Sequence, residues 1–298
     1  MIVSASRRTD IPAFYGDWLL GRLEEGWVRV PNPFNPKQIQ VVEMDPRELG
    51  AIVFWTKDPA PLMPRLETME RLGFDRYTFL FTLNDYPRAI EPGLPPLAER
   101  VATFRRLARR IGPDRVTWRY DPVILSDHCS TREHIRRFAA LARALAGSTR
   151  RVVVAMLHRY RKTRRGLARV PGWAEGTGEF PSPATKEQLT RAFARFAAGA
   201  GMAIQACAQE GRLLPSIPDG PCIDGDRLGR LFGLPLETGP HRGQRPACRC
   251  SRSVDIGVND TCAHGCLYCY ATRDPAKAAR LCADQDRRAP SLGQGGPT

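Results

Sequence analysis

Residues 76–83 read "RYTFLFTL", residues 97–111 read "LAERVATFRRLARRI" and residues 115–120 read "RVTWRY". The first and last of these stretches are short and apolar, which is typical of buried strands. The middle stretch repeats apolar residues every three or four positions and so indicates one face of a helix. A strand, a helix and a strand in succession indicate part of a parallel sheet with helices packed on it.

The same alternation continues along most of the chain and predicts seven strands. Two further helices are expected at 131–146 and 185–200, where Ser130 with Glu133 and Thr185 with Gln188 give capping-box signals. Residues 27–42 are the candidate for an eighth strand. The other apolar stretches that we interpret as strands are 1–6, 50–56, 151–157, 202–207 and 253–258.

This pattern predicts an α/β fold, a TIM-like (β/α) parallel barrel that is either complete or partial. We expect one domain over residues 1–283, with a cysteine-rich elaboration at 207–271. Residues 284–298 read "DQDRRAPSLGQGGPT" and are expected to be a disordered tail.

The composition narrows the classes of function. The chain of 298 residues has a net charge of +14, which would suit a nucleic-acid partner, but only five of its cations are lysines. Many arginines fall on the polar faces of predicted helices, so solvated helix faces are favoured over polyanion binding.

The apolar runs are too short to span a bilayer, and the N-terminus shows no secretory signal. We therefore expect a cytoplasmic protein with no membrane partner. Nine cysteines in such a compartment indicate metal or redox chemistry rather than a disulfide framework.

Polar residues follow the predicted strands, at the edge where β/α barrels carry their working residues. Each of them alone is more often a capping or ion-pair residue, but as a set on one rim they predict a site for a charged ligand. His128 and His134 are expected to be structural. We predict catalytic roles for Lys57, Arg119 and His158, and cofactor-binding roles for Ser4, Arg7 and Asp10.

The stretch "TCAHGCLYCYA" at 261–271 holds Cys262, Cys266 and Cys269 on a loop between the last predicted strand and a helical stretch. Three thiolates at this spacing can bind three corners of a cubane iron–sulfur cluster and leave the fourth iron open for a small molecule. A zinc site is the alternative, although zinc sites favour paired C-x2-C units.

This C-x3-C-x2-C motif, with an aromatic residue before its third cysteine, resembles that of the radical S-adenosylmethionine (SAM) enzymes. In that superfamily the motif usually follows the first barrel strand, whereas here it follows the last. The chain therefore resembles a circularly permuted radical SAM barrel, in which the N-terminal strand lies beside the cysteine strand. The loop "SASRRTD" then takes the place of the loop that binds the SAM amino group, although it lacks the superfamily's Gly-Gly-Glu stretch.

The whole chain also resembles a bacterial family catalogued only as a domain of unknown function. Three stretches carry this resemblance: "SASRRTDIP" at 4–12, "FWTKDP" at 54–59 and "CRCSRSVDIGVNDTCAHGCLYCYA" at 248–271.

The radical SAM resemblance implies a [4Fe-4S] cluster on Cys262, Cys266 and Cys269, with SAM on its open iron and Tyr268 on the adenine side. An electron donor such as flavodoxin or ferredoxin would reduce the cluster, and a 5′-deoxyadenosyl radical would take hydrogen from an unknown small or peptide-like substrate. The alternatives are a radical SAM enzyme that acts on nucleic acid, similar to spore photoproduct lyase, and a non-enzymatic zinc or iron–sulfur protein.

Four further cysteines, outside this motif, are candidates for an auxiliary iron–sulfur cluster or a zinc site. Cys129 and Cys282 fit no group and are expected to be structural, and a buried thiol of no further role is the alternative for the first of the four. The four candidates are Cys207, Cys222, Cys248 and Cys250.

Overall fold

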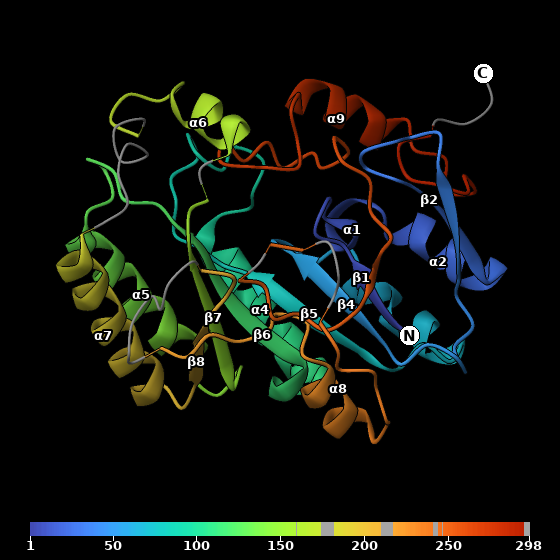
Figure 1. Cartoon of the computed structure of the whole chain (residues 1–298), viewed down its shortest axis with the longest axis horizontal. Coiled ribbons are helices and arrows are strands. Elements are labelled where there is room, and N and C mark those ends of the chain that lie inside the picture. The colour runs from blue at the N-terminus through green and yellow to red at the C-terminus, as the bar shows by residue number, and fades with distance from the viewer. Residues whose placement is uncertain (159, 174–181, 210–216, 241–243, 246, 295–298) are drawn as a thin grey trace.

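The computed structural model describes residues 1–158, 160–173, 182–209, 217–240, 244–245 and 247–294. Within these residues, seven strands pair in parallel into one sheet, in the order β8-β7-β6-β5-β4-β1-β9 (Figure 1). The strands are β1 (Ile2–Ala5), β4 (Ala51–Thr56), β5 (Tyr77–Thr82), β6 (Val116–Val123), β7 (Arg151–Met156), β8 (Ala203–Ala206) and β9 (Val254–Asp255).

Helices connect the strands and flank the sheet (Figure 1). Short 3-10 helices cover Met63–Arg65 and Pro113–Arg115. The α-helices are α1 (Ile11–Phe14), α2 (Gly16–Glu25), α3 (Leu66–Arg71), α4 (Leu97–Ile111), α5 (Thr131–Leu145), α6 (Arg161–Leu167), α7 (Pro183–Gly199), α8 (Gly225–Phe232) and α9 (Pro275–Ala283).

The capping residues explain where two of the expected helices begin. Ser130 caps α5 as predicted, because its hydroxyl accepts the backbone N–H of Glu133 at 3.3 Å. Helix α7 begins earlier than Thr185, the predicted start. Ser182 caps it by accepting the N–H of Thr185 at 3.1 Å, and Pro183 occupies the first turn, where its missing N–H costs nothing.

Both faces of the sheet are covered, which explains why its central strands read as continuous apolar runs. Residues of β4, β5 and β7 are buried along their whole length. On one face, Phe54 stacks on Phe79 with ring centroids 4.8 Å apart, within the core that the helices share. On the other face, which we call the inner face, alternate residues such as Val53 pack in one cluster with Cys207, Cys222 and Cys250.

The last strand of the sheet in the sequence lies beside the first. β9 pairs in parallel with β1, with Val254 opposite Val3 and Asp255 opposite Ser4. The expectation that the N-terminal strand lies beside the cysteine strand is therefore confirmed. In the described part of the chain, β8 and β9 are the two ends of the strand order.

Residues 27–42 do not supply an eighth strand of this sheet, so that prediction is wrong. They form most of a separate antiparallel hairpin of β2 (Trp27–Pro31) and β3 (Ile39–Glu43). The physical reason is the short connection, because two strands joined by a tight loop pair antiparallel, whereas parallel neighbours need a long crossover.

The prediction of a disordered tail is wrong for residues 284–294, which pack on α2. Trp18 donates its indole N–H to the carbonyl of Ala289 at 2.8 Å, and Leu292 is buried in the main core. The apolar residues of this polar stretch are sufficient to anchor it. Residues 295–298 lie outside the described residues. No helix in the described ranges combines the length and apolar character needed to cross a membrane.

Candidate functional site

The loop between β9 and α9 carries Cys262, Cys266 and Cys269, hereafter the cysteine triad. Asp274 ends this loop by capping α9, since its carboxylate accepts the N–H of Lys277 at 3.0 Å. All three thiols are free and none is fully exposed. The triad therefore lies at the carboxyl edge of the sheet, as the sequence predicted.

The surroundings of the three sulfur atoms suit metal-bound thiolates. The backbone N–H of Thr272 donates to Cys269 Sγ at 3.3 Å, a contact that stabilises negative charge on sulfur. Burial raises the pKa of the Cys266 thiol to about 12, and the Lys57 ammonium acts in the opposite direction. Binding of iron would supply the positive charge that offsets this burial, because metal ligation requires deprotonated thiols.

The triad has the donor set for three corners of an iron–sulfur cluster: three thiols at separate positions, an N–H donor to sulfur and a nearby cation. Among the described residues, no group of three or more His, Cys, Asp or Glu side chains is already arranged around a metal-ion position.

Lys57 sits in a buried polar cluster behind the triad. Its ammonium donates to Glu91 Oε1 at 2.9 Å and to the Tyr268 hydroxyl at 2.7 Å. The Tyr268 hydroxyl donates to the same carboxylate, and Arg100 Nη1 lies 3.6 Å from Glu91 Oε2. Burial acts to lower the pKa of Lys57, but the Glu91 carboxylate and Cys266 together outweigh it, and the pKa is raised overall. Because Tyr268 immediately precedes Cys269, this cluster fixes the end of the triad.

Asp10 links three parts of the site. Its Oδ2 accepts the backbone N–H of Lys57 at 2.7 Å and a hydrogen bond from His264 Nε2 at 2.8 Å. Its Oδ1 caps α1 by accepting the N–H of Ala13 at 3.1 Å. His264 lies inside the triad, so Asp10 holds the cysteine loop against the loops that follow β1 and β4.

Asp255 holds the loop after β1 against the cysteine strand. It accepts hydrogen bonds from the Ser4 hydroxyl at 2.8 Å, the Ser6 hydroxyl at 2.7 Å and the backbone N–H of Arg7 at 2.8 Å. It also accepts the N–H of Gly257 at 3.1 Å. Ser4 is fully buried, so its side chain positions the loop and does not face solvent.

Two glycines allow other loops to close on the cysteine loop. Gly93 donates its N–H to the His264 carbonyl at 2.9 Å, and a Cβ at Gly93 would lie 2.6 Å from that oxygen. A Cβ at Gly166 in α6 would lie 1.8 Å from the Leu267 carbonyl oxygen. The triad is therefore enclosed between the β5–α4 connection and α6.

We expect Gly166→Ala to displace the cysteine loop and to destabilise the protein by about 1–3 kcal/mol, since the methyl group would overlap a backbone atom. Gly199→Ala at the end of α7 is the matched control, because nothing lies within 4 Å of its Cβ position. Urea unfolding of the two variants beside the wild type measures the difference. Equal midpoints for both variants would show that α6 does not confine the loop.

Arg119 lies under the rim and is not a neighbour of the triad. Its guanidinium carbon lies 4.5 Å from the Trp55 ring centroid, and Nη2 pairs with the Asp121 carboxylate. The guanidinium carbon of Arg7, in the loop after β1, lies 6.0 Å from the centroid of the same ring. The N–H groups of Arg119 Nε and Trp55 Nε1 are buried without a partner among the described residues. Strands β4 and β6 and the loop after β1 therefore meet at Trp55.

His158 follows β7 at the same edge. Its Nε2 lies 3.4 Å from Gln209 Nε2, and its ring lies 6.1 Å from that of Tyr160. Tyr160 in turn faces Tyr270 at 5.8 Å, and the Tyr270 hydroxyl donates to the Arg7 carbonyl at 2.7 Å. A path of side chains thus joins His158 to the end of the cysteine loop.

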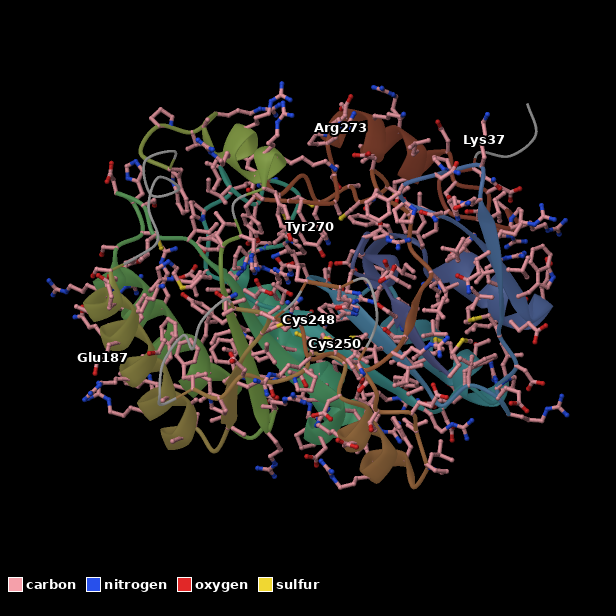
Figure 2. The ribbon with its side chains drawn as sticks, viewed as in Figure 1. Lys37, Glu187, Cys248, Cys250, Tyr270 and Arg273 are labelled. Atoms are coloured by element: carbon pink, nitrogen blue, oxygen red, sulfur yellow. The ribbon has the colours of Figure 1, made fainter. Side chains whose placement is uncertain are left out.

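The four remaining candidate cysteines come together on the inner face of the sheet, and we call them the second thiol group. Cys222 donates to Cys207 Sγ at 2.8 Å, and its thiol lies near that of Cys250. Cys248 donates to Gln244 Oε1 at 2.6 Å and lies near Cys250, beside which it is labelled near the centre of Figure 2. Residues 210–216, 241–243 and 246 of the expected elaboration lie outside the described residues.

The site contains residues that the sequence pattern did not single out. Asp255 offered a signal, because it is an acid inside the apolar stretch "SVDIGV". His264 lies within the triad motif and could have been found there. Glu91 and Trp55 gave no such signal, since their roles depend on which loops meet. Cys129 and Cys282 do not contact either cysteine group in the interactions that the structure records.

The fold and the site define an α/β protein whose parallel sheet carries one group of cysteines after the carboxyl end of β9 and a second group against one of its faces. The family model described as "Domain of unknown function (DUF1848)" matches residues 2–271, and the chain belongs to this family. The resemblance noted at residues 4–12, 54–59 and 248–271 is thereby confirmed. A search of curated proteins gave no match, and neither did a search of solved structures.

Proposed function

We propose that this protein is a radical SAM enzyme built on a partial (β/α) barrel in permuted order. One observation carries the proposal: the strand that leads into the cysteine triad pairs in parallel with β1. This pairing brings the three thiols to the edge where the loops after β1, β4 and β5 converge. The triad, Lys57 and Asp10 then share one site.

The triad residues would hold three irons of a [4Fe-4S] cluster, and the open iron would take SAM. When bound, this pair supplies a 5′-deoxyadenosyl radical after one-electron reduction by a donor such as flavodoxin or ferredoxin. The chain supplies three free thiols, the N–H of Thr272 to Cys269 Sγ and the ammonium of Lys57 near Cys266.

The surrounding residues position the reacting groups. Glu91 and Lys57 fix Tyr268 and therefore Cys269, and Asp10 fixes His264 between the first two cysteines of the triad. Asp255 holds the "SASRR" loop beside the triad, at the place proposed for SAM. Lys57 and Asp10 thus act in support of the triad, whereas Arg7 and Tyr270 are partly exposed at the rim and can contact SAM or substrate.

The proposed substrate is a small or peptide-like molecule that enters the rim. The competing function is a radical SAM enzyme that acts on nucleic acid, which the net charge of +14 favours. Fluorescence anisotropy with a single-stranded oligonucleotide at two salt concentrations distinguishes the two proposed substrates. Binding that weakens steeply with salt supports the nucleic-acid substrate, and no binding supports the small substrate.

Anaerobic reconstitution with iron and sulfide tests the proposed function. We expect an EPR signal of the dithionite-reduced protein that SAM perturbs, and the loss of this perturbation in Cys266→Ala. Cys282→Ala is the control, because Cys282 lies in α9 outside both groups. Zinc without iron, or a cluster signal unchanged by SAM, would overturn the proposal in favour of a structural metal site.

A further inference from the structure

We propose that Cys207, Cys222, Cys248 and Cys250 bind a second iron–sulfur cluster, closed by four protein thiolates. This site goes beyond the proposed function, because it shares no ligand with the triad. The second cluster can therefore be present or absent independently of a cluster on the triad.

The second thiol group is assembled from three separate parts of the chain. Cys207 immediately follows β8, Cys222 lies in the loop before α8, and Cys248 and Cys250 lie in the loop that leads to β9. The Cys222 thiol donates to Cys207 Sγ at 2.8 Å, and Cys250 lies near enough to both Cys222 and Cys248 to affect their pKa values. The fold thus brings four thiols from three segments to one place, as the ligands of a cluster would have to be.

The surroundings are those of a buried cluster rather than of reactive thiols. Cys207, Cys222 and Cys250 are at most 7 % exposed and pack against apolar residues of the inner sheet face. The backbone N–H of Ile223 donates to Cys250 Sγ at 3.4 Å. Such N–H contacts to sulfur, together with burial, are among the features that tune protein-bound iron–sulfur clusters.

Arg119 supplies the cation that a cluster with four thiolates needs. It lies close enough to Cys222 and Cys207 to interact with both electrostatically, and its side chain is only 14 % exposed. Its Nε–H has no partner among the described residues. Arg119, which also pairs with Asp121, thus places a buried positive charge near Cys207 and Cys222, where it offsets part of the negative charge that burial would otherwise make costly.

A disulfide bond and a zinc ion are the alternatives to a cluster at this site. Cys207 and Cys222 are both free, and the Cys222 thiol donates to Cys207 Sγ at 2.8 Å. Zinc sites favour C-x2-C pairs, whereas this group contains a C-x-C pair and two isolated cysteines.

A cluster with four protein ligands has no open iron. The second cluster would therefore not bind SAM, and its chemistry would be the storage or transfer of single electrons. Tyr270 is electrostatically linked both to Cys269 of the triad and to Arg119 beside the second thiol group. Tyr270 and Arg119 therefore lie near each other, the first close to the triad and the second close to the second thiol group.

Iron and sulfide counts on anaerobically reconstituted protein test the inference. We expect about eight irons per wild-type chain and about four in Cys222→Ala, with the SAM-perturbed EPR signal of the triad retained. Cys248→Ser, at the half-buried position, is the second variant, and Cys282→Ala is the control with unchanged iron. In Cys266→Ala, the opposite result is expected: a cluster signal that remains but no longer responds to SAM.

The outcomes separate the second cluster from the proposed function. About four irons in the wild type, all lost in Cys266→Ala and none lost in Cys222→Ala, would overturn the second cluster and leave the enzyme. One zinc released by Cys222→Ala, or a Cys207–Cys222 disulfide found by mass spectrometry in anaerobic protein, would also overturn it. A protein with about eight irons per chain whose EPR signal does not change with SAM would support the second cluster and overturn the proposed function.

Discussion

Replacement of Glu91 by alanine is expected to destabilise the protein by about 3–5 kcal/mol. The carboxylate accepts from Lys57 at 2.9 Å, lies 3.6 Å from Arg100 and accepts from Tyr268. The side chains of Lys57 and Arg100 are 15 % and 4 % exposed, so both cations would stay buried without a counter-charge. Removal of one partner from a buried ion pair has a cost of about this size.

Urea unfolding under anaerobic conditions measures this effect, with Glu99→Ala as the matched control. Glu99 lies in α4 on the exposed surface, and we expect its removal to change the free energy of unfolding by less than about 0.5 kcal/mol. Glu91→Gln keeps the shape but not the charge and should lie between the two. Similar midpoints for Glu91→Ala and Glu99→Ala would show that the cluster behind the triad contributes nothing to stability.

We expect His134 to make the protein lose stability between about pH 6.5 and pH 4. The ring is fully buried, with Nε2 at 2.8 Å from the Ile124 carbonyl and Nδ1 at 2.8 Å from the Tyr120 hydroxyl. Burial lowers the pKa of His134 to about 4. Above pH 6.5 the ring is neutral in both folded and unfolded chains, so His134 adds no pH dependence to the free energy of unfolding there.

As the pH falls below 6.5, the unfolded chain takes up a proton on this ring and the folded chain does not. Unfolding is therefore favoured, and the loss approaches about 3 kcal/mol near pH 4. Urea unfolding at pH 7 and pH 4.5 should show a smaller pH effect in His134→Gln than in the wild type. His128→Gln, at an exposed position, should keep the wild-type pH effect. An undiminished effect in His134→Gln, or an NMR pKa near 6.5, would contradict the prediction.

The strands of the sheet were predictable because their apolar runs are long enough to be buried on both faces. Residues such as those of β4 and β5 carry this signal on their own. The β2–β3 hairpin was missed as a separate sheet, since an apolar stretch does not reveal its pairing partner. Residues 284–294 were also missed, because Ala289 and Leu292 are too few to stand out in a polar stretch.

The cysteine triad was predictable because its spacing alone places three thiols together. Sequence also suggested the second thiol group, but only the fold brings Cys207 and Cys222 within contact of each other across 15 positions. Glu91 could not be predicted, because it pairs with Lys57 at 34 positions distance and with Tyr268 at 177. Such partners depend on which loops meet in the folded chain, and composition and periodicity do not reveal this.

The pairing of β9 with β1 also has a consequence for biosynthesis. The six other strands of the sheet, together with the helices from α1 to α7, leave the ribosome before Cys207, and before every thiol of both cysteine groups. Chains fold from the N-terminus during synthesis, so the face that receives the cysteines can form first. Until residues 254–255 arrive, one edge of β1 has no partner from β9. An unpaired edge is a template for aggregation, so a stall in translation after β8 would leave this edge of β1 open to pairing with another chain.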